Sequence, residues 1–180
     1  YTGEVYCARA NAYAELIKCF CEAYDESDPY QLGVALDSTF FGRKPLKRST
    51  LKESYDFVIR DLKKAEELLD EDNDWYTNPY VTKAAAQALR ARVALYMKDA
   101  DTAIEYSTKL IESDVFALST SSVYTSGADP LTGATRSFTY VDYMWTHDLS
   151  TEIIWQIGFL PTSYGGALGQ VFLNFNNDFT

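Results

Sequence analysis

Residues 50–69 constrain the fold of this chain most strongly, because they carry the marks of an amphipathic helix at its start and along its whole length. Thr50 precedes Glu53 by three residues, the spacing of a capping box, in which each side chain accepts a hydrogen bond from the other residue's backbone N–H. Apolar residues then recur at alternating steps of four and three, which places them on one helical face. They are Leu51, Tyr55, Val58, Leu62, Ala65 and Leu69. Such a face must be covered, so we expect this helix to pack against other helices.

The same periodicity predicts three more helices, over residues 5–23, 83–97 and 100–112, and residues 32–36 are expected to be extended and packed. Thr82 is the expected N-cap of the helix over 83–97. The tight turn at 98–99 should make the last two helices antiparallel neighbours, like the hairpin of a tetratricopeptide repeat. The expected inward residues are Val5, Ala8, Ala12, Leu16, Cys19, Phe20 and Ala23, then Ala84, Ala85, Ala88, Ala91 and Leu95, and finally Ala103, Ile104, Ser107, Leu110 and Ile111.

The character of the sequence changes after residue 116. Ser, Thr and Gly are frequent over 119–137, and apolar alternation over 138–145 and 152–159 predicts two short strands. The predicted fold class is therefore mainly α, with tetratricopeptide-like helical hairpins and an irregular, loop-rich portion that contains short strands. We expect residues 1–118 to form the helical part and residues 119–180 the irregular part of the same overall domain.

Composition and charge narrow the possible functions. The chain has 180 residues and a net charge of −10, which disfavours binding to nucleic acids and to anionic membrane surfaces. Cys7, Cys19 and Cys21 are odd in number, so they form no closed disulfide framework, and we expect them to be small buried apolar residues. The sequence opens almost directly into a helical pattern and ends without a terminator, so we expect it to be an internal piece of a longer protein.

Catalytic and metal-binding motifs are absent from the sequence. His147 is the single histidine and has Asp148 beside it, but no nucleophile motif accompanies them. The acidic run at 70–74 begins like a calcium loop, yet Trp75 and Val81 stand where an EF-hand needs glycine and a bidentate glutamate. We therefore expect a solvated helix end there, with a nonstandard calcium site left open. The predicted protein is not an enzyme, and no cofactor or metal is expected.

The order of the motifs resembles that of the SusD/RagB-type glycan-binding lipoproteins of Gram-negative outer membranes. The pieces that carry the resemblance are residues 8–13 (ARANAY) with Leu16, 32–36 (LGVAL), 48–59 (RSTLKESYDFVI) with Asp61 and Leu62, 82–89 (TKAAAQAL), 91–97 (ARVALYM), 103–106 (AIEY) and 150–157 (STEIIWQI). Ala35 departs from the pattern, because the family usually has proline there. The co-linear order covers about residues 5–175.

The resemblance implies a fold and a function. Such proteins are mainly helical, tetratricopeptide-like scaffolds that carry an irregular ligand-binding half, which here corresponds to residues 119–180. They are surface-exposed lipoproteins of the outer membrane, where they sit on a SusC-like, TonB-dependent transporter and deliver oligosaccharides or starch-like polysaccharides to it. They bind without hydrolysing, and their lipid anchor lies outside the present sequence. Two alternatives stay open: a tetratricopeptide-like protein-interaction module without glycan binding, and a carboxylate-based glycosidase.

Sugar recognition requires flat aromatic faces for the C–H faces of a pyranose and planar polar groups for its hydroxyls. Tyr164 is the first candidate, because the adjacent Gly165 and Gly166 would leave its ring exposed on a loop. The full set of candidate glycan-binding residues is Tyr164, Trp145, Tyr143, Trp75, Asn174 and Asn176. The competing hypothesis is that these rings pack in the interior, as we expect of Trp155, which alternates with Ile153 and Ile157.

Overall fold

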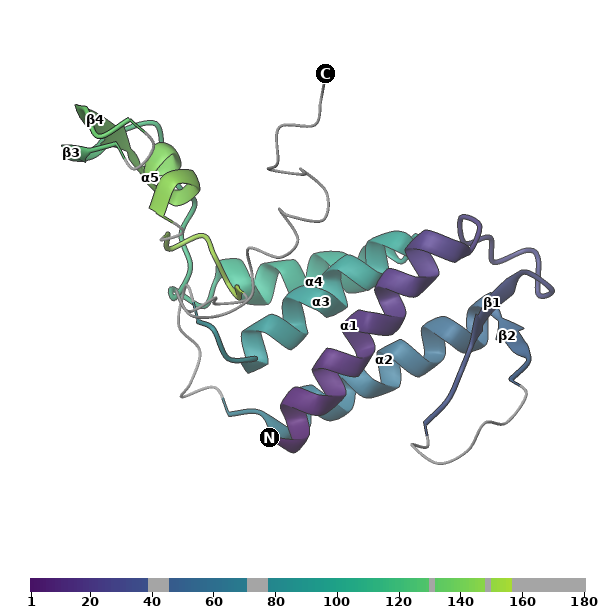
Figure 1. The fold of residues 1–180 in the computed structure, drawn as a ribbon. Coiled ribbons are helices and arrows are strands. Elements are labelled where there is room, and N and C mark those ends of the chain that lie inside the picture. The colour runs from purple at the N-terminus through teal and green to yellow at the C-terminus, as the bar shows by residue number, and fades with distance from the viewer. Residues whose placement is uncertain (39–45, 71–77, 130–131, 148–149, 157–180) are drawn as a thin grey trace, which may run out of the picture.

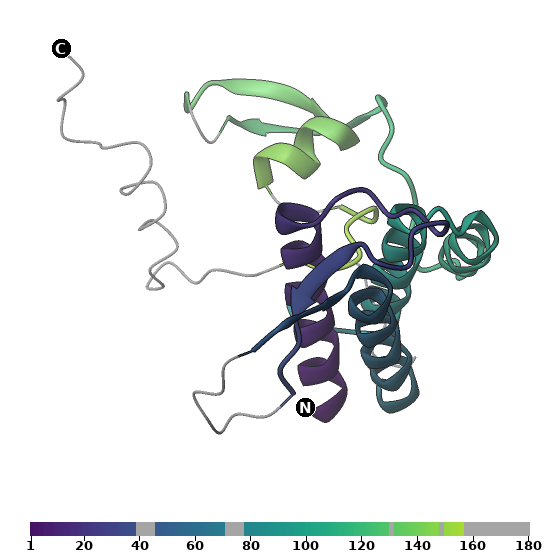
Figure 2. The ribbon, with the colours of Figure 1, turned by 90° about the vertical axis from the view of Figure 1, so that its right-hand side faces the viewer.

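The computed structural model describes residues 1–38, 46–70, 78–129, 132–147 and 150–156. Its elements in chain order are α1 (Thr2–Phe20), β1 (Leu32–Ala35), β2 (Arg48–Thr50), α2 (Leu51–Leu68), α3 (Lys83–Tyr96), α4 (Ala100–Ile111), β3 (Val123–Ala128), β4 (Thr135–Thr139) and α5 (Tyr140–His147). Helices α1 to α4 lie side by side, whereas β3, β4 and α5 form a separate group at one end (Figures 1 and 2). The predicted mainly helical fold with short strands is confirmed.

Helix α2 is the central element of the helical part, and its predicted start and inward face are both correct. The Thr50 hydroxyl accepts from the Glu53 N–H at 3.2 Å, and the Glu53 carboxylate accepts from the Thr50 N–H at 2.8 Å. These hydrogen bonds to Thr50 lower the pKa of Glu53. The predicted face lies in the core, where Leu51, Tyr55, Val58, Leu62 and Ala65 are buried and Leu69 is partly buried.

Helix α1 packs on α2 with the face opposite to the predicted one. Gly3, Cys7, Ala10, Ala14 and Ile17 are buried, and most of them are small, which lets the two helices approach closely. A Cβ at Gly3 would lie 2.8 Å from Leu69 Cγ. The predicted inward set was wrong: Val5, Ala8, Ala12, Leu16, Cys19, Phe20 and Ala23 are exposed. Cys19 is therefore not the buried residue that the sequence suggested.

A buried ion pair fixes this rotation of α1. Arg9 donates from Nε to Asp61 Oδ2 at 2.6 Å and from Nη2 to Asp61 Oδ1 at 3.0 Å. The Asp61 side chain is 1% exposed and that of Arg9 is 30% exposed. The hydrogen bond to Asp61 raises the pKa of Arg9. Because an uncompensated carboxylate in the core is costly, the pair favours a rotation of α1 that keeps Arg9 at the edge of the contact with α2.

Strands β1 and β2 form a two-stranded antiparallel sheet that covers the start of α2. Residues 32–36 were predicted to be extended, and β1 confirms this for Leu32–Ala35. Gly33 allows the close approach, since a Cβ there would overlap Ser54 Oγ and the carbonyl oxygen of Thr50. Ser54 Oγ in turn accepts from the Val34 N–H at 3.0 Å. The sheet and α2 are thus joined through buried hydrogen bonds.

Helices α3 and α4 form the predicted hairpin, and the Thr82 hydroxyl caps α3 by accepting from the Ala85 N–H at 3.1 Å. The small-residue face predicted for α3 is buried at Ala84, Ala85 and Ala91. Three predicted inward residues, Leu95, Ile104 and Ile111, are exposed instead. Within the described ranges, α4 packs along α3 and reaches α2 through the Tyr106 hydroxyl, which donates to Glu66 Oε2 at 3.2 Å. Just one narrow face of α4, which includes the buried Tyr106, is therefore covered.

The strand predicted over 138–145 is right only at Phe138 and Thr139, and the strand predicted over 152–159 is wrong for the residues that the structure describes. Residues 135–139 pair as β4 with β3, and the chain then turns into α5 at Tyr140. Between 152 and 156, Trp155 makes an isolated bridge to Asn78 and no longer strand is formed. Residues 157–159 lie outside the described part of the chain.

Candidate ligand-binding surface

The β3–β4 hairpin and α5 hold an aromatic cluster outside the helical part, formed by Tyr124, Phe138, Tyr140 and Tyr143 and called here the Tyr124 cluster. Tyr124 comes from β3, Phe138 from β4 and the other two from α5. Tyr140 and Tyr143 are three residues apart, so they lie on one side of the helix. The hairpin and the helix thereby present their rings to one another.

The start of α5 is fixed by a local cap that orients these tyrosines. The Thr139 hydroxyl accepts from the Asp142 N–H at 3.1 Å, and the Asp142 carboxylate accepts from the Thr139 N–H at 3.2 Å and from its hydroxyl at 2.9 Å. These hydrogen bonds lower the pKa of Asp142. The arrangement is that of a capping box with aspartate in the place of glutamate. It determines where the helix begins and thus which side chains face β3.

The Tyr124 cluster combines one buried ring with rings that are partly exposed. The Tyr124 ring centroid lies 4.8 Å from that of Tyr140 and 4.8 Å from that of Tyr143, with interplanar angles of 51° and 57°. Phe138 is 1% exposed, whereas Tyr124 is 49% and Tyr140 is 43% exposed. The Arg136 guanidinium lies 4.5 Å from the Phe138 ring centroid. Two tyrosines are thus held by packing while they remain partly exposed.

The structure brings together one of the predicted site residues with three that were not in the predicted set, Tyr124, Phe138 and Tyr140. Tyr143 belongs to the Tyr124 cluster. Trp145 is 77% exposed, but it follows Tyr140 by five residues, about 140° around the helix, and makes no ring contact among the described residues. The other predicted residues, Tyr164, Trp75, Asn174 and Asn176, lie outside the described ranges.

Trp155 was predicted to be a core residue, and it lies half-buried against α3. Together with Ile153 it lines a hollow of about 300 Å³ whose other wall includes Ala85 and Leu89. The Gln156 N–H donates to the Asn78 carbonyl at 3.2 Å beside it. This contact attaches the segment after α5 to the helical part.

Neither a metal centre nor a membrane span emerges from the described residues. Within them, no three His, Cys, Asp or Glu side chains gather as metal ligands, and the acidic residues 71–74 lie outside the described ranges. No described helix is long and apolar enough to cross a bilayer.

Comparison with known proteins gives matches over the helical part. The sequence model of a SusD-like family described as "Starch-binding associating with outer membrane" matches residues 1–95. A SusD-like protein of Formosa agariphila is 31% identical over 120 residues, which cover 67% of this chain and 22% of that protein. The chain thus spans about a fifth of the length of this curated relative. The family match ends before the Tyr124 cluster, which lies beyond α4.

Solved structures share the arrangement of the helices. A SusD superfamily protein from Bacteroides thetaiotaomicron is 26% identical with a TM-score of 0.59, over 64% of this chain and 25% of that one. One from Bacteroides vulgatus is 31% identical with a TM-score of 0.54, over 64% and 27% of the two chains. One from Bacteroides fragilis covers 91% of this chain and 34% of its own, with a TM-score of 0.63; at 24% identity it supports the fold alone.

Proposed function

The chain belongs to the SusD-like family, and from this premise we propose that it forms part of a cell-surface protein that binds oligosaccharides or starch-like polysaccharides. The family description as starch-binding supports the ligand class. We assign residues 1–118 to the scaffold and residues 119–180 to the ligand-binding part. This division is supported by the position of the Tyr124 cluster in the group formed by β3, β4 and α5 (Figure 1).

The Tyr124 cluster is the observation that carries this proposal. A pyranose presents apolar C–H faces and a rim of hydroxyls, so it is recognised by aromatic faces that have hydrogen-bonding groups nearby. Tyr124 and Tyr140 each offer both, a partly exposed ring and a phenolic hydroxyl. Their rings are already held at 4.8 Å from one another, so a sugar would bind without first ordering them.

The other predicted residues complete the proposed site. Trp145 projects from α5 on a different side from Tyr140, which suits a second contact along an extended glycan rather than the same sugar ring. Tyr164, Trp75, Asn174 and Asn176 remain predicted contributors. Recognition by stacking and hydrogen bonding needs no catalytic pair, so we propose a binding protein without hydrolytic activity.

The proposed context is an outer-membrane uptake system. In this proposal the protein is a surface-exposed lipoprotein whose lipid anchor lies outside the present sequence. Its partner is a SusC-like, TonB-dependent transporter, to which it hands the glycan. The family description as associating with the outer membrane supports the location.

Isothermal titration of the full-length protein against neutral oligosaccharides tests the proposal. Truncating a central aromatic residue of an interface commonly costs more than 1 kcal/mol, so Tyr124→Ala should weaken binding by about tenfold. Tyr30→Ala is the matched control, because Tyr30 is exposed and lies outside the Tyr124 cluster. Absence of binding to every glycan, or equal affinity of the Tyr124→Ala variant and the unaltered protein, would contradict the proposed site.

The alternative, a protein-interaction module, draws on the exposed apolar residues of α3 and α4. Leu95 and Ile104 line an open hollow of about 310 Å³ between these helices. Ile104→Asp should abolish capture of a peptide ligand and leave glycan binding unchanged. A pull-down in which this variant still retains its peptide, or in which the unaltered protein captures no peptide, removes the alternative.

A further inference from the structure

A groove between α1 and α2 has chemistry that differs from that of the Tyr124 cluster. We propose that this groove binds the carboxylate of a uronic-acid sugar and thus gives the protein a second subsite, for acidic glycans. The proposal rests on the proposed function for the idea that the ligand is a glycan. It does not depend on the Tyr124 cluster, since no residue is shared between the two places.

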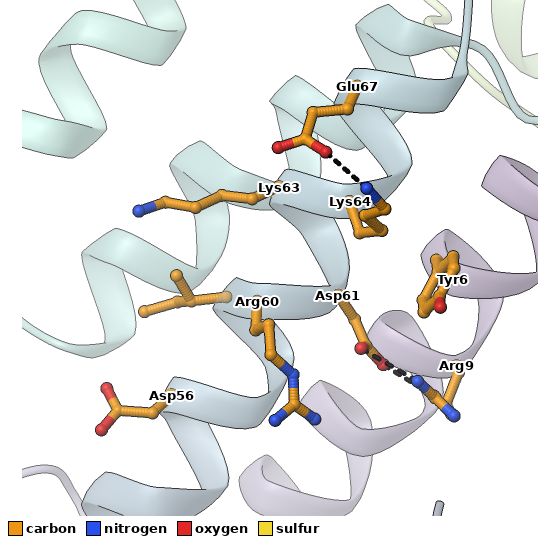
Figure 3. Close-up of a pocket in the computed structure, with 9 residues that line it drawn as sticks. Tyr6, Arg9, Asp56, Arg60, Asp61, Lys63, Lys64 and Glu67 are labelled. Carbon is orange, nitrogen blue, oxygen red and sulfur yellow. Dashed lines mark hydrogen bonds and ion pairs between the residues drawn. The ribbon is translucent and has the colours of Figure 1, made fainter.

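The size of the groove suits a small ligand. It is an open hollow of about 690 Å³, within the range of pockets that hold small molecules. Tyr6 and Arg9 line the groove from α1, and Arg60 and Asp61 line it from α2 (Figure 3). Ile59 and Lys63 of α2 are also among the lining residues. Both walls belong to packed helices, so the groove has a defined shape before any ligand arrives.

The carboxylates of the groove are already paired, so they do not neutralise its remaining cations. Asp61 is paired with Arg9 at 2.6 Å, Asp56 with Lys52 at 2.8 Å and Glu67 with Lys64 at 2.8 Å. Two further cations of the groove, Arg60 and Lys63, have no ion-pair partner among the described residues. Arg60 therefore remains available to an anionic ligand.

Two guanidiniums are held near the same ring. The Arg60 guanidinium lies 4.8 Å and that of Arg9 lies 5.1 Å from the ring centroid of Phe57, which is buried. Arg9 extends from α1 toward Asp61, Arg60 extends along α2, and Lys63 projects from the other side of α2 (Figure 3). Arg9 uses Nε and Nη2 for Asp61, and no hydrogen bond among the described residues occupies its Nη1.

This geometry favours a carboxylate as the bound group. The fork of Arg60 can donate two parallel hydrogen bonds to one carboxylate, and Arg9 Nη1 can add a third from the opposite wall. Cation–π contact with Phe57 restrains Arg60 in advance, which lowers the entropy cost of binding.

A sugar fits the rest of the groove better than an acidic peptide or a lipid headgroup. The half-exposed Tyr6 and Ile59 give apolar surface beside the guanidiniums, as the C–H face of a pyranose requires. The chain carries a net charge of −10, so a densely anionic polymer or bilayer would be repelled by the surrounding surface. A short oligosaccharide with spaced carboxylates would meet the cations of the groove alone.

The test is titration of the full-length protein with trigalacturonate and with its neutral counterpart, galactotriose. Arg60→Gln should weaken trigalacturonate binding at least tenfold and leave binding of neutral glycans unchanged. Lys47→Gln is the matched control, because it removes the same charge from an exposed side chain outside the groove. Since Arg60 is exposed, its replacement should not unfold α2, which circular dichroism checks.

Two results would overturn the inference. One is equal trigalacturonate affinity in the Arg60→Gln and Lys47→Gln variants. The other is displacement of trigalacturonate by polyglutamate or by phosphatidylglycerol vesicles as readily as by unlabelled trigalacturonate. Tyr124→Ala separates this inference from the proposed function. It should weaken neutral-glycan binding about tenfold and leave trigalacturonate binding to the uronate subsite unchanged, so the two sites can fail independently.

Discussion

Replacing Arg9 by methionine should destabilise the helical part by about 3 kcal/mol, because it leaves a buried carboxylate without its cation. Asp61 is 1% exposed and receives both of its charged hydrogen bonds from Arg9. Breaking a buried ion pair by removing one partner costs roughly 3–5 kcal/mol. The lower end applies here, since the Arg9 side chain is 30% exposed and water reaches the edge of the pair.

The opposite truncation should cost less. In Asp61→Asn the charge that is left over sits on Arg9, which can turn its exposed end into water, so we expect a loss of about 1–2 kcal/mol. Replacing both partners, as Arg9→Met with Asp61→Leu, removes both charges and fills the same space. That double variant should lie within about 1 kcal/mol of the unaltered chain, because apolar isosteres often match a buried ion pair.

Urea unfolding followed by far-ultraviolet circular dichroism measures these differences, since helices dominate the signal. The expected order of stability places the double variant above Asp61→Asn, and Asp61→Asn above Arg9→Met. The double variant also serves as the control for lost packing. If Arg9→Met were as stable as the unaltered chain, or if the double variant were the least stable of the three, the argument from the buried charge would be refuted.

Three further predictions concern packing, capping and cysteine exposure. Gly33→Ala should lower the thermal midpoint and the free energy of unfolding, the latter by about 1–3 kcal/mol, because the new Cβ would overlap the carbonyl oxygen of Thr50. Gly127→Ala is the control and should leave the thermal midpoint unchanged, because no atom lies within 4 Å of its Cβ. Thr50→Ala removes the cap of α2 and should cost about 1 kcal/mol in urea unfolding, whereas Thr50→Ser should restore it. A thiol reagent at pH 8 should modify the exposed Cys19 rapidly and Cys7 only after unfolding, since burial raises the pKa of Cys7 to about 12. Equal modification rates for the two thiols would contradict the packing of α1.

The elements that the sequence predicts correctly are those with local signals. The capping box at Thr50 and the apolar face of α2 act within a few residues, and both are found in the structure. Helix α1 is different, because it is apolar on two sides. Which of the two sides is buried depends on α2. The small residues around Cys7 pack closely against α2, and Arg9 pairs with the buried Asp61 of α2. Periodicity within α1 contains neither fact.

The candidate site was predictable only in part. The alternation over 138–145 favoured a strand, yet the spacing of Thr139 and Asp142 is a cap signal that could have identified α5. With that helix in place, Tyr140 and Tyr143 would have been assigned to one face. Tyr124 gives no such signal, because its role arises from pairing of β3 with β4. The Tyr124 cluster is assembled from β3, β4 and α5, so it depends on contacts that no single segment encodes.

A crystal structure of the full-length protein with a bound neutral oligosaccharide tests the central claim most directly. The account predicts a pyranose ring in van der Waals contact, about 4 Å, with Tyr124 and Tyr140, and a sugar hydroxyl bonded to one of their phenolic oxygens. A glycan bound elsewhere, with both tyrosines covered by other parts of the protein, would contradict it.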